Sequence, residues 1–166
     1  MQRCVRHKER NVVLHLAERD RPPIQARMRR AWAETDHDRA LEQLRRLADE
    51  LDHTHPGAAG SLREGMAETL TVIRLRIKGR LKRTLESTNP CESMIDCVRV
   101  TQHNVKRWSS GEMAMRWTAA GMLEAEKQFR KVIGYLELPK LAIAIERRLH
   151  LHQPTPTQEA TIPVTV

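Results

Sequence analysis

The sequence predicts a mainly α-helical protein with at most one short strand. Aromatic residues make up only 3% of the chain, so leucine, isoleucine, valine, methionine and alanine must supply its core. Seven glycines and eight prolines are too few for the many turns of an all-β chain of 166 residues. Apolar residues also recur at steps of three and four along several segments, which is the spacing of one helix face. A chain of this length can bury a core of its own.

Residues 1–80 are predicted to form a compact bundle of four helices. Residues 4–18 contain helix formers and neither glycine nor proline, and Pro22-Pro23 ends this run and opens a second helix over about 23–34. Asp36 is placed to cap a third helix. The apolar face of this third helix comprises Leu41, Leu44, Ala48 and Leu51.

The fourth helix has two candidate starts. Pro56-Gly57 ends the third helix, and Pro56 suits the first position of the next one. Ser61 and Glu64 form a capping-box pattern that would instead place the start later. An apolar stripe at helical spacing follows and comprises Leu62, Met66, Leu70, Ile73 and Ile77.

Residues 81–152 are predicted to be helical after a break in the pattern. Lys78–Arg83 interrupts the periodicity, and Arg83–Glu86 is the candidate short strand. Asn89 is placed to cap a helix that runs to about His103. The apolar face of this helix comprises Cys91, Met94, Ile95 and Val98, and its polar face Glu92, Asp96, Arg99 and His103.

Two more helices and a tail complete the predicted organisation. Ser110 or Gly111 starts a helix that runs to about Val132, and Pro139 opens the last helix. Residues 153–166 are rich in proline and threonine and lack an amphipathic pattern, which predicts a disordered tail. The last helix is expected to bury Leu138, Leu141, Ala142, Ile145 and Leu149.

The charge indicates a polyanionic partner. With 29 basic and 21 acidic residues, the formal net charge is +8, which favours nucleic acid. A membrane partner is not expected, because no run approaches the roughly 18 apolar residues of a spanning helix. Met1–Lys8 leads into charged residues rather than a secretory signal. Three cysteines in such a chain indicate reduced thiols in a cytoplasm.

Glu92 is the main candidate for a catalytic residue. It lies in the first turn of its helix, after Ser87-Thr88-Asn89-Pro90-Cys91, where the helix start would hold its carboxylate rigidly near a phosphate. Carboxylate oxygen is the ligand that Mg²⁺ prefers, so Glu92 is also the candidate metal ligand. The alternative is structural: the carboxylate can reach back to the Asn89 backbone amide and favour the helix dipole. The spacing excludes neither role.

Cys4 and His7 lie three residues apart on one helical face. A zinc site needs four protein ligands, or three and a water molecule. No second pair stands at ligand spacing, since Cys91 and Cys97 are six residues apart. The sequence therefore argues against zinc, and favours a buried thiol packed by a hydrogen-bonded imidazole.

Polar and basic residues around and after Glu92 are the candidates for DNA contacts, the alternative being an ordinary solvated helix face. The candidate DNA-binding residues are Asn89, Arg99, Asn104, Lys106, Arg107 and Trp108. Further cations in the same half are His103, Arg116, Lys127, Arg130 and Lys131. Weaker candidates are Arg27, Arg29, Arg30 and the segment Arg74–Arg83.

Together these motifs resemble the C-terminal portion of the Mutator-type transposases of bacterial insertion sequences. The opening Gln2–Val12 resembles the Cys-x-x-His element of that family, with its following lysine and Arg-Asn pair. Ser87–Ser93 resembles its Ser-Thr-Asn-x-x-Glu motif. Asn104–Trp108 and Met115–Trp117 stand where the family carries its basic stretch. The similarity covers nearly everything up to about residue 150.

The resemblance implies a DDE enzyme with a ribonuclease-H-like core, in which two aspartates and one glutamate hold two Mg²⁺ ions. It maps Glu92 onto that glutamate, and residues of about 12–80 onto a helical insertion. Residues 81–152 then form the C-terminal part of the core. Cys4 and His7 map onto an element that follows the second aspartate, as a structural motif near the active site and not as metal ligands.

The resemblance also implies that both catalytic aspartates are absent, because the sequence begins after the place of the second one. We therefore expect a truncated transposase that is inactive alone. Mg²⁺ is expected only in the complete enzyme, whose partner would be double-stranded DNA at transposon terminal repeats in a bacterial cytoplasm, near the nucleoid. The sequence is compatible with a homo-oligomer, since the first helix would leave an apolar surface that favours association.

Two other functions remain open at this point. One is a non-catalytic basic DNA-binding module, and the other is a helical interaction protein whose charge serves only solubility. DNA affinity that falls steeply with salt separates the DNA binders from the interaction protein. The substitution Glu92→Gln in a complete enzyme separates catalysis from DNA binding alone.

Overall fold

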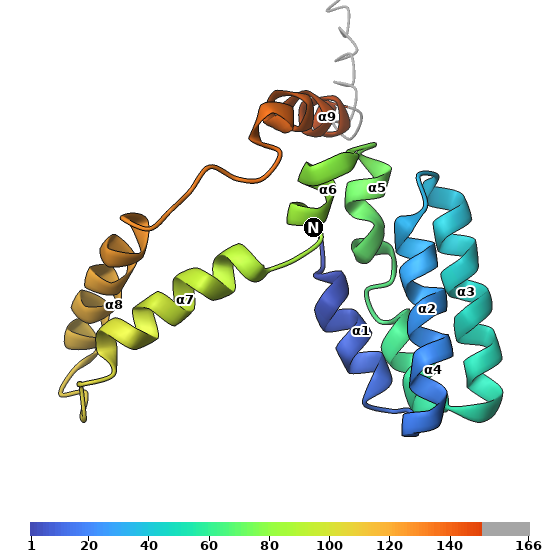
Figure 1. Ribbon diagram of the computed structural model, residues 1–166, viewed down its shortest axis with the longest axis horizontal. Helices are drawn as coiled ribbons and strands as arrows, with labels where there is room; N and C mark the ends of the chain where they lie inside the picture. Colours follow the sequence, from blue (N-terminus) through green and yellow to red (C-terminus); the bar gives the residue numbers. More distant parts are fainter. Residues whose placement is uncertain (151–166) are drawn as a thin grey trace, which may run out of the picture.

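The computed structural model describes residues 1–150, and every regular element in that range is a helix, as predicted. The predicted tail, residues 153–166, lies outside the described residues. The elements, shown in Figure 1, are α1 (Val5–Val13), η1 (Glu18–Asp20), α2 (Arg21–Ala33), α3 (His37–Thr54), α4 (Pro56–Arg63), η2 (Ala67–Leu70), α5 (Thr71–Arg74), α6 (Gly79–Leu85), α7 (Asn89–Gln102), α8 (Gly111–Glu126), η3 (Tyr135–Glu137) and α9 (Leu138–His150). No helix in residues 1–150 has the length and apolar character needed to cross a membrane.

Helices α1–α4 form a compact bundle around the main hydrophobic core (Figure 1). All residues of this core precede residue 74, and most come from the apolar faces that the sequence pattern predicts. Its largest fully buried aliphatic side chains are Met28, Leu44, Leu47, Leu62 and Leu70. A smaller cluster of Val72, Ile77 and Leu81 continues the apolar interior into α6, and Leu141 of α9 packs against it.

The predicted helix boundaries of the bundle are partly confirmed. Asp36 caps α3 by accepting a hydrogen bond from the Arg39 amide at 2.8 Å, and both prolines lie in the first turn of α2. The first helix is shorter than predicted, because the chain turns after Val13 and does not continue to residue 18. This turn lets α2 run back along α1.

The predicted apolar stripe after Pro56 is not one continuous helix. Helix α4 begins at Pro56, so the capping-box prediction is wrong: Ser61 lies inside α4 and Glu64 follows its last residue. Gly65 has φ +62°, a left-handed conformation that ends a helix, and η2 and α5 follow it. The buried ammonium of Lys8 donates to the Ser61 and Glu64 carbonyls and thereby satisfies this helix end.

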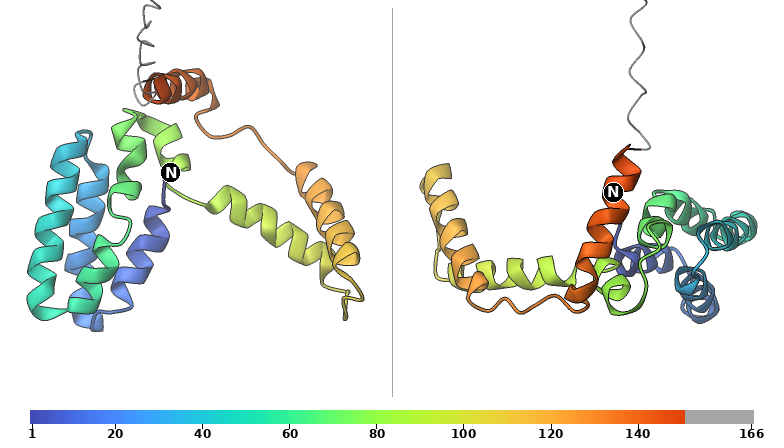
Figure 2. Two further views of the ribbon diagram at one scale, coloured as in Figure 1. Left: turned by 180° about the vertical axis from the view of Figure 1, so that it is seen from behind. Right: turned by 90° about the horizontal axis from the view of Figure 1, so that it is seen from above.

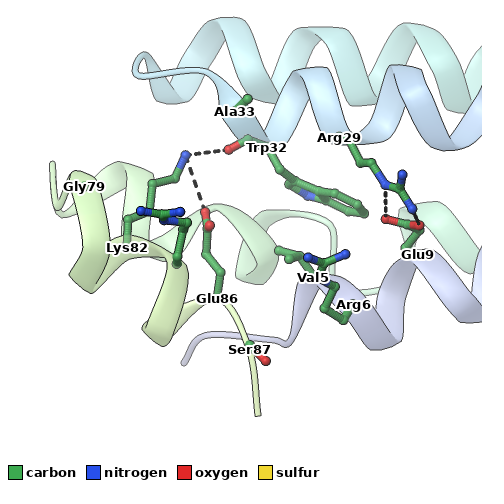
Figure 3. A pocket seen from close by; sticks show the side chains of 11 residues that line it. Val5, Arg6, Glu9, Arg29, Trp32, Ala33, Gly79, Lys82, Glu86 and Ser87 are labelled. Carbon is green, nitrogen blue, oxygen red and sulfur yellow. Dashed lines mark hydrogen bonds and ion pairs between the residues drawn. The ribbon is translucent and has the colours of Figure 1, made fainter. Parts of the chain in front are cut away.

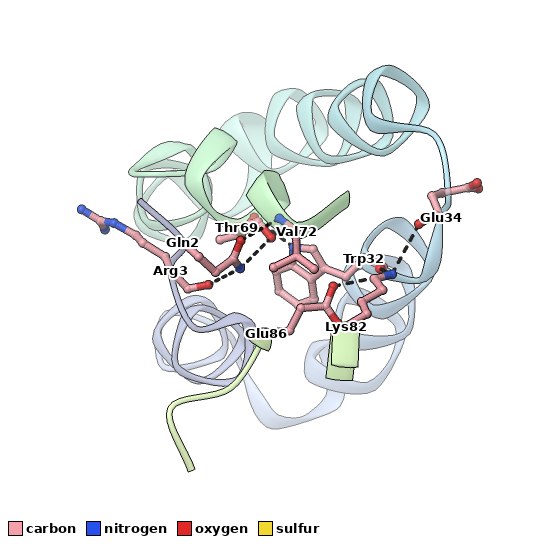
Figure 4. Close-up of polar contacts among 8 residues, drawn as sticks. All are labelled: Gln2, Arg3, Trp32, Glu34, Thr69, Val72, Lys82 and Glu86. Atoms are coloured by element: carbon pink, nitrogen blue, oxygen red, sulfur yellow. Dashed lines mark hydrogen bonds and ion pairs between the residues drawn. The ribbon is translucent and has the colours of Figure 1, made fainter. Parts of the chain in front are cut away.

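Polar contacts join the start of the chain and α6 to the bundle. The Lys82 ammonium donates to the Trp32 carbonyl and lies near the Glu86 carboxylate (Figure 3). The Trp32 indole donates to the Thr69 hydroxyl at 3.1 Å, in the buried interior. The Gln2 amide group bonds both the Thr69 carbonyl and the Val72 amide (Figure 4). These contacts hold the first residues and α6 in fixed positions on either side of the core.

The segment predicted as a short strand, Arg83–Glu86, belongs to helix α6 and its C-cap. The prediction is wrong because Leu81 and Leu85 bury one face of a helix against Val72 and Ile77. Helix α7 begins at Asn89 with Thr88 as its N-cap, one residue before the predicted cap. Ser110 caps α8 by accepting from the Met113 amide at 3.1 Å, but α8 ends at Glu126 and not near Val132.

Helices α7 and α8 form an arm, residues 89–126, which stands apart from the bundle in all three views (Figures 1 and 2). The two helices pack closely at Gly121, where an added Cβ atom would lie 2.9 Å from Val98 Cα. Only Val98, Gly121 and Ala125 are buried in the arm. Of the predicted apolar face of α7, Cys91 and Ile95 are exposed.

The predicted burial of α9 is also wrong for most of its residues. No residue of α9 is buried, and Leu138, Ile145 and Leu149 are 40%, 42% and 62% exposed. Leu141 is the exception, since it packs against the Val72, Ile77 and Leu81 cluster. The helix forms as its pattern predicts, but little of the described chain lies against its apolar face.

We predict that stability resides in the bundle and not in the arm. Leu44→Ala removes a fully buried side chain and should lower the free energy of unfolding by about 2–5 kcal/mol. Leu123→Ala, at a position 63% exposed on α8, should change it by less than about 0.5 kcal/mol. Chemical denaturation followed by circular dichroism measures both, and equal losses would contradict this distribution.

Candidate functional site

The two motifs singled out in the sequence meet in space. The amide of Val5, at the start of α1, donates to the Glu86 carbonyl at 3.0 Å. This backbone bond places the Cys4–His7 element beside the turn Ser87-Thr88 that leads into α7. Residues that are 81 positions apart in sequence, His7 and Thr88, are therefore within 3.3 Å of each other.

Glu92 lies at the centre of this meeting point. Its carboxylate oxygen Oε1 accepts a hydrogen bond from the Thr88 hydroxyl and lies 3.5 Å from His7 Nε2. His7 Nδ1 in turn lies 3.3 Å from the Thr88 hydroxyl. The side chains of His7 and Glu92 are 48% and 47% exposed, so the carboxylate is positioned by protein groups and still open to a ligand.

The alternative role of Glu92 as a helix cap is only partly compatible with the structure. The Asn89 amide donates to the Ser87 hydroxyl at 3.1 Å, so Glu92 does not cap it. The Glu92 amide continues the helix by donating to the Thr88 carbonyl at 2.9 Å. The position in the first turn of α7 still favours a negative charge through the helix dipole.

Cys4 is half-buried beside this turn, and its surroundings stabilise the thiolate. Partial burial raises the pKa of the Cys4 thiol, but the neighbouring Thr88 side chain and hydrogen bonds from the backbone amides of His7, Thr88 and Arg6 lower it to about 7. Cys4 is thus less buried than predicted, and His7 contacts Thr88 and Glu92.

The donor set near Glu92 does not complete a metal site. Within residues 1–150, no group of three or more histidine, cysteine, aspartate or glutamate side chains could hold a metal ion. A divalent cation that prefers oxygen needs several ligands, and Glu92 supplies one carboxylate.

The predicted DNA-contacting residues separate into two regions. Asn89 lies one turn before Glu92, at the start of α7. Asn104, Lys106, Arg107 and Trp108 lie past the other end of this helix, about 18 Å away along its axis at 1.5 Å per residue. Arg99 pairs with Asp96 at 3.1 Å on the exposed surface of α7.

A pocket of about 470 Å³ adjoins the site, and sequence reasoning did not identify it. Its lining in Figure 3 comes from α1, α2 and α6. Glu86 is buried there, and burial raises the pKa of its carboxyl, which the Lys82 ammonium at 3.5 Å partly opposes. The four-residue spacing of Lys82 and Glu86 was visible in the sequence, but the burial of Glu86 depends on tertiary contacts of α6, which packs against Val72 and Ile77 and is bonded through Lys82 to the Trp32 carbonyl.

Comparison with known families supports the resemblance seen in the motifs. The family model described as Transposase, Mutator family, matches residues 1–132. The match includes the Cys4–His7 element and Glu92, and it ends before α9, short of the similarity to about residue 150 that the motifs indicate. No curated protein and no solved structure matches the chain.

We predict that the Cys4 thiol, whose pKa is lowered to about 7, reacts as a thiolate at neutral pH. In a Cys91→Ser, Cys97→Ser background, its alkylation by iodoacetamide should rise with pH through a midpoint near 7, because the thiolate is the nucleophile. Thr88→Val should move this midpoint upward, since the polar Thr88 side chain that lowers the pKa of the Cys4 thiol is lost. Thr101→Val, whose hydroxyl bonds the Cys97 carbonyl at 2.9 Å, is the matched control. A midpoint that Thr88→Val leaves unchanged would contradict the assignment.

Proposed function

Since the chain belongs to the Mutator family of transposases, we propose that it acts in DNA transposition, with Glu92 as one of the carboxylates of a metal-dependent strand-transfer site. The observation that carries this proposal is the contact of His7 and Thr88 with the Glu92 carboxylate. Two motifs distant in sequence converge on one acid. A purely local helix cap would not need the Cys4–His7 element to lie against it.

The residues of this chain hold the carboxylate. Thr88 donates to carboxylate oxygen Oε1, and His7 Nε2 lies 3.5 Å from the same oxygen. In phosphoryl transfer, bound Mg²⁺ stabilises the charge that develops on the phosphate oxygens. One carboxylate is too few for this role, so we propose that two further acidic ligands come from outside residues 1–150 and that the chain alone is inactive.

DNA contacts are proposed for the exposed basic stretch at the tip of the arm, Asn104–Trp108. Trp108 is 44% exposed and stands directly after Lys106 and Arg107, so its ring and their charges are all available to a ligand. Phosphates bind such cations without sequence preference. The proposed partner is double-stranded DNA at the transposon ends.

The second candidate function is a DNA-binding module without catalysis. The absence of a metal-binding group of acids within residues 1–150 favours it for the isolated chain. The two functions share the same DNA contacts and differ only in the role of Glu92.

We predict that Glu92→Gln, in a complete transposase carrying this segment, lowers strand cleavage by more than ~100-fold, beyond the loss expected when only a partner of a metal ligand is removed. DNA affinity should stay unchanged, because the amide keeps the side chain's shape. Asp96→Asn, one turn later on α7 and paired with Arg99, removes the same charge and should cleave normally.

Cleavage of end-labelled terminal-repeat DNA with Mg²⁺ or Mn²⁺ measures both variants. Normal cleavage by Glu92→Gln would rule out its role as a metal ligand. Robust cutting by the purified chain alone would rule out the need for further acidic ligands.

A further inference from the structure

A second pocket, of about 700 Å³, shares Arg83 and Ser87 with the first and has a strongly basic lining. Its walls come from α6, from the start of α7 and from the segment after α8, and none of its lining residues is acidic. The polar and charged residues of this groove are Arg80, Arg83, Thr84, Ser87, Asn89, Arg130 and Lys131.

Within the described part of the chain, the cations of the groove have no acidic partners. Among residues 1–150, no carboxylate lies within ion-pair distance of Arg80, Arg83 or Arg130, and the Lys131 ammonium lies 4.9 Å above the Tyr135 ring. Some arginines of the bundle are matched, as Arg27 is by Glu50 through two hydrogen bonds, whereas others such as Arg39 and Arg45 have no ion pair within residues 1–150. Uncompensated arginines gathered around one hollow create a local positive potential that attracts polyanions.

The walls of the groove are held together by close contacts. The Thr84 hydroxyl of α6 donates to the Ile133 carbonyl at 3.1 Å. Gly134 has φ +88°, and a Cβ atom there would lie 2.5 Å from the Leu81 amide nitrogen. Only glycine allows this approach, so Arg130 and Lys131 are fixed opposite Arg80 and Arg83.

We propose that this groove binds the sugar–phosphate backbone of one DNA strand and leads it to Glu92. Guanidinium groups bind phosphates through paired hydrogen bonds, and side-chain hydroxyls and helix N-termini add further donors. The groove ends at Asn89 and Pro90, less than one helical turn before Glu92. A strand that follows it reaches the carboxylate, whereas the tip of the arm contacts DNA farther away. The identity of the polyanion as DNA rests on the proposed function.

The first test removes one cation from each wall. Arg80→Gln with Arg130→Gln should lower the affinity for a fluorescein-labelled DNA duplex of arbitrary sequence, measured by fluorescence anisotropy at several salt concentrations. The slope of log K against log[salt] should fall in magnitude by about 1.8, since each lost phosphate contact contributes about 0.9. The control pair Arg39→Gln with Arg45→Gln removes two exposed charges from α3 and should leave the slope unchanged. Equal slopes for the two pairs would overturn the proposal.

The second test moves a wall and keeps every charge. Gly134→Ala should weaken DNA binding several-fold, because the new methyl group pushes the segment with Arg130 and Lys131 away from Leu81. Gly111→Ala, where nothing lies within 4 Å of the added atom, should bind as the parent does. A thermal melt checks that the bundle is intact, and unchanged binding by Gly134→Ala would refute the geometry.

The outcomes separate this inference from the proposed function. If the groove variants lose DNA affinity while Glu92→Gln still cleaves, DNA binding by the groove is supported and the catalytic assignment of Glu92 is wrong. If Glu92→Gln abolishes cleavage and the groove variants bind DNA normally, the catalytic assignment of Glu92 is supported and DNA binding by the groove is wrong.

Discussion

The hydrogen bond from the Val5 amide to the Glu86 carbonyl, 3.0 Å long, joins the first helix to the turn before α7. Without it, the Cys4–His7 element and Glu92 would belong to separate parts of the chain. Hydrogen bonds to the bundle hold both segments that this bond joins. Before α1, Gln2 bonds the Thr69 carbonyl and the Val72 amide, and in α6 Lys82 bonds the Trp32 carbonyl. The position of the carboxylate therefore depends on the packing of the whole bundle and not only on the start of its own helix.

The distribution of burial divides the described chain into a bundle with a complete core and an arm and last helix that bury little. The main core is complete by residue 73, so the bundle can support other elements. The arm and α9 instead expose many of their large apolar side chains, among them Met115, Trp117, Leu123 and Leu149. Their helices are set by capping and by local pattern, since Ser110 and Pro139 stand at helix starts. The helices of the arm and α9 are therefore specified by local sequence, and little of the described chain covers their apolar faces.

Sequence reasoning predicted the fold class and the helices with clear end signals, such as α2 and α3. It failed where tertiary contacts decide the outcome. Gly65 interrupts an apolar stripe whose helical spacing continues to Ile77. The segment predicted as a strand is helical because Leu81 and Leu85 pack against the apolar surface of Val72 and Ile77. In the site, the motifs identified Cys4, His7 and Glu92, but not the role of Thr88 between them. The basic groove could not be predicted, because Arg80 and Arg130 come together through tertiary contacts, those of Gly134 with Leu81 and of Thr84 with Ile133.

The arm leaves the bundle at Ser87 and returns at Ile133, and these two points are adjacent because Thr84 is bonded to the Ile133 carbonyl. Both ends of a long, otherwise unattached hairpin are thus anchored at one place. Both ends of this hairpin are therefore held close to Glu92, which lies in the first turn of α7. The position of Asn104–Trp108 relative to Glu92 thus depends on one pair of adjacent anchors and on the length of α7.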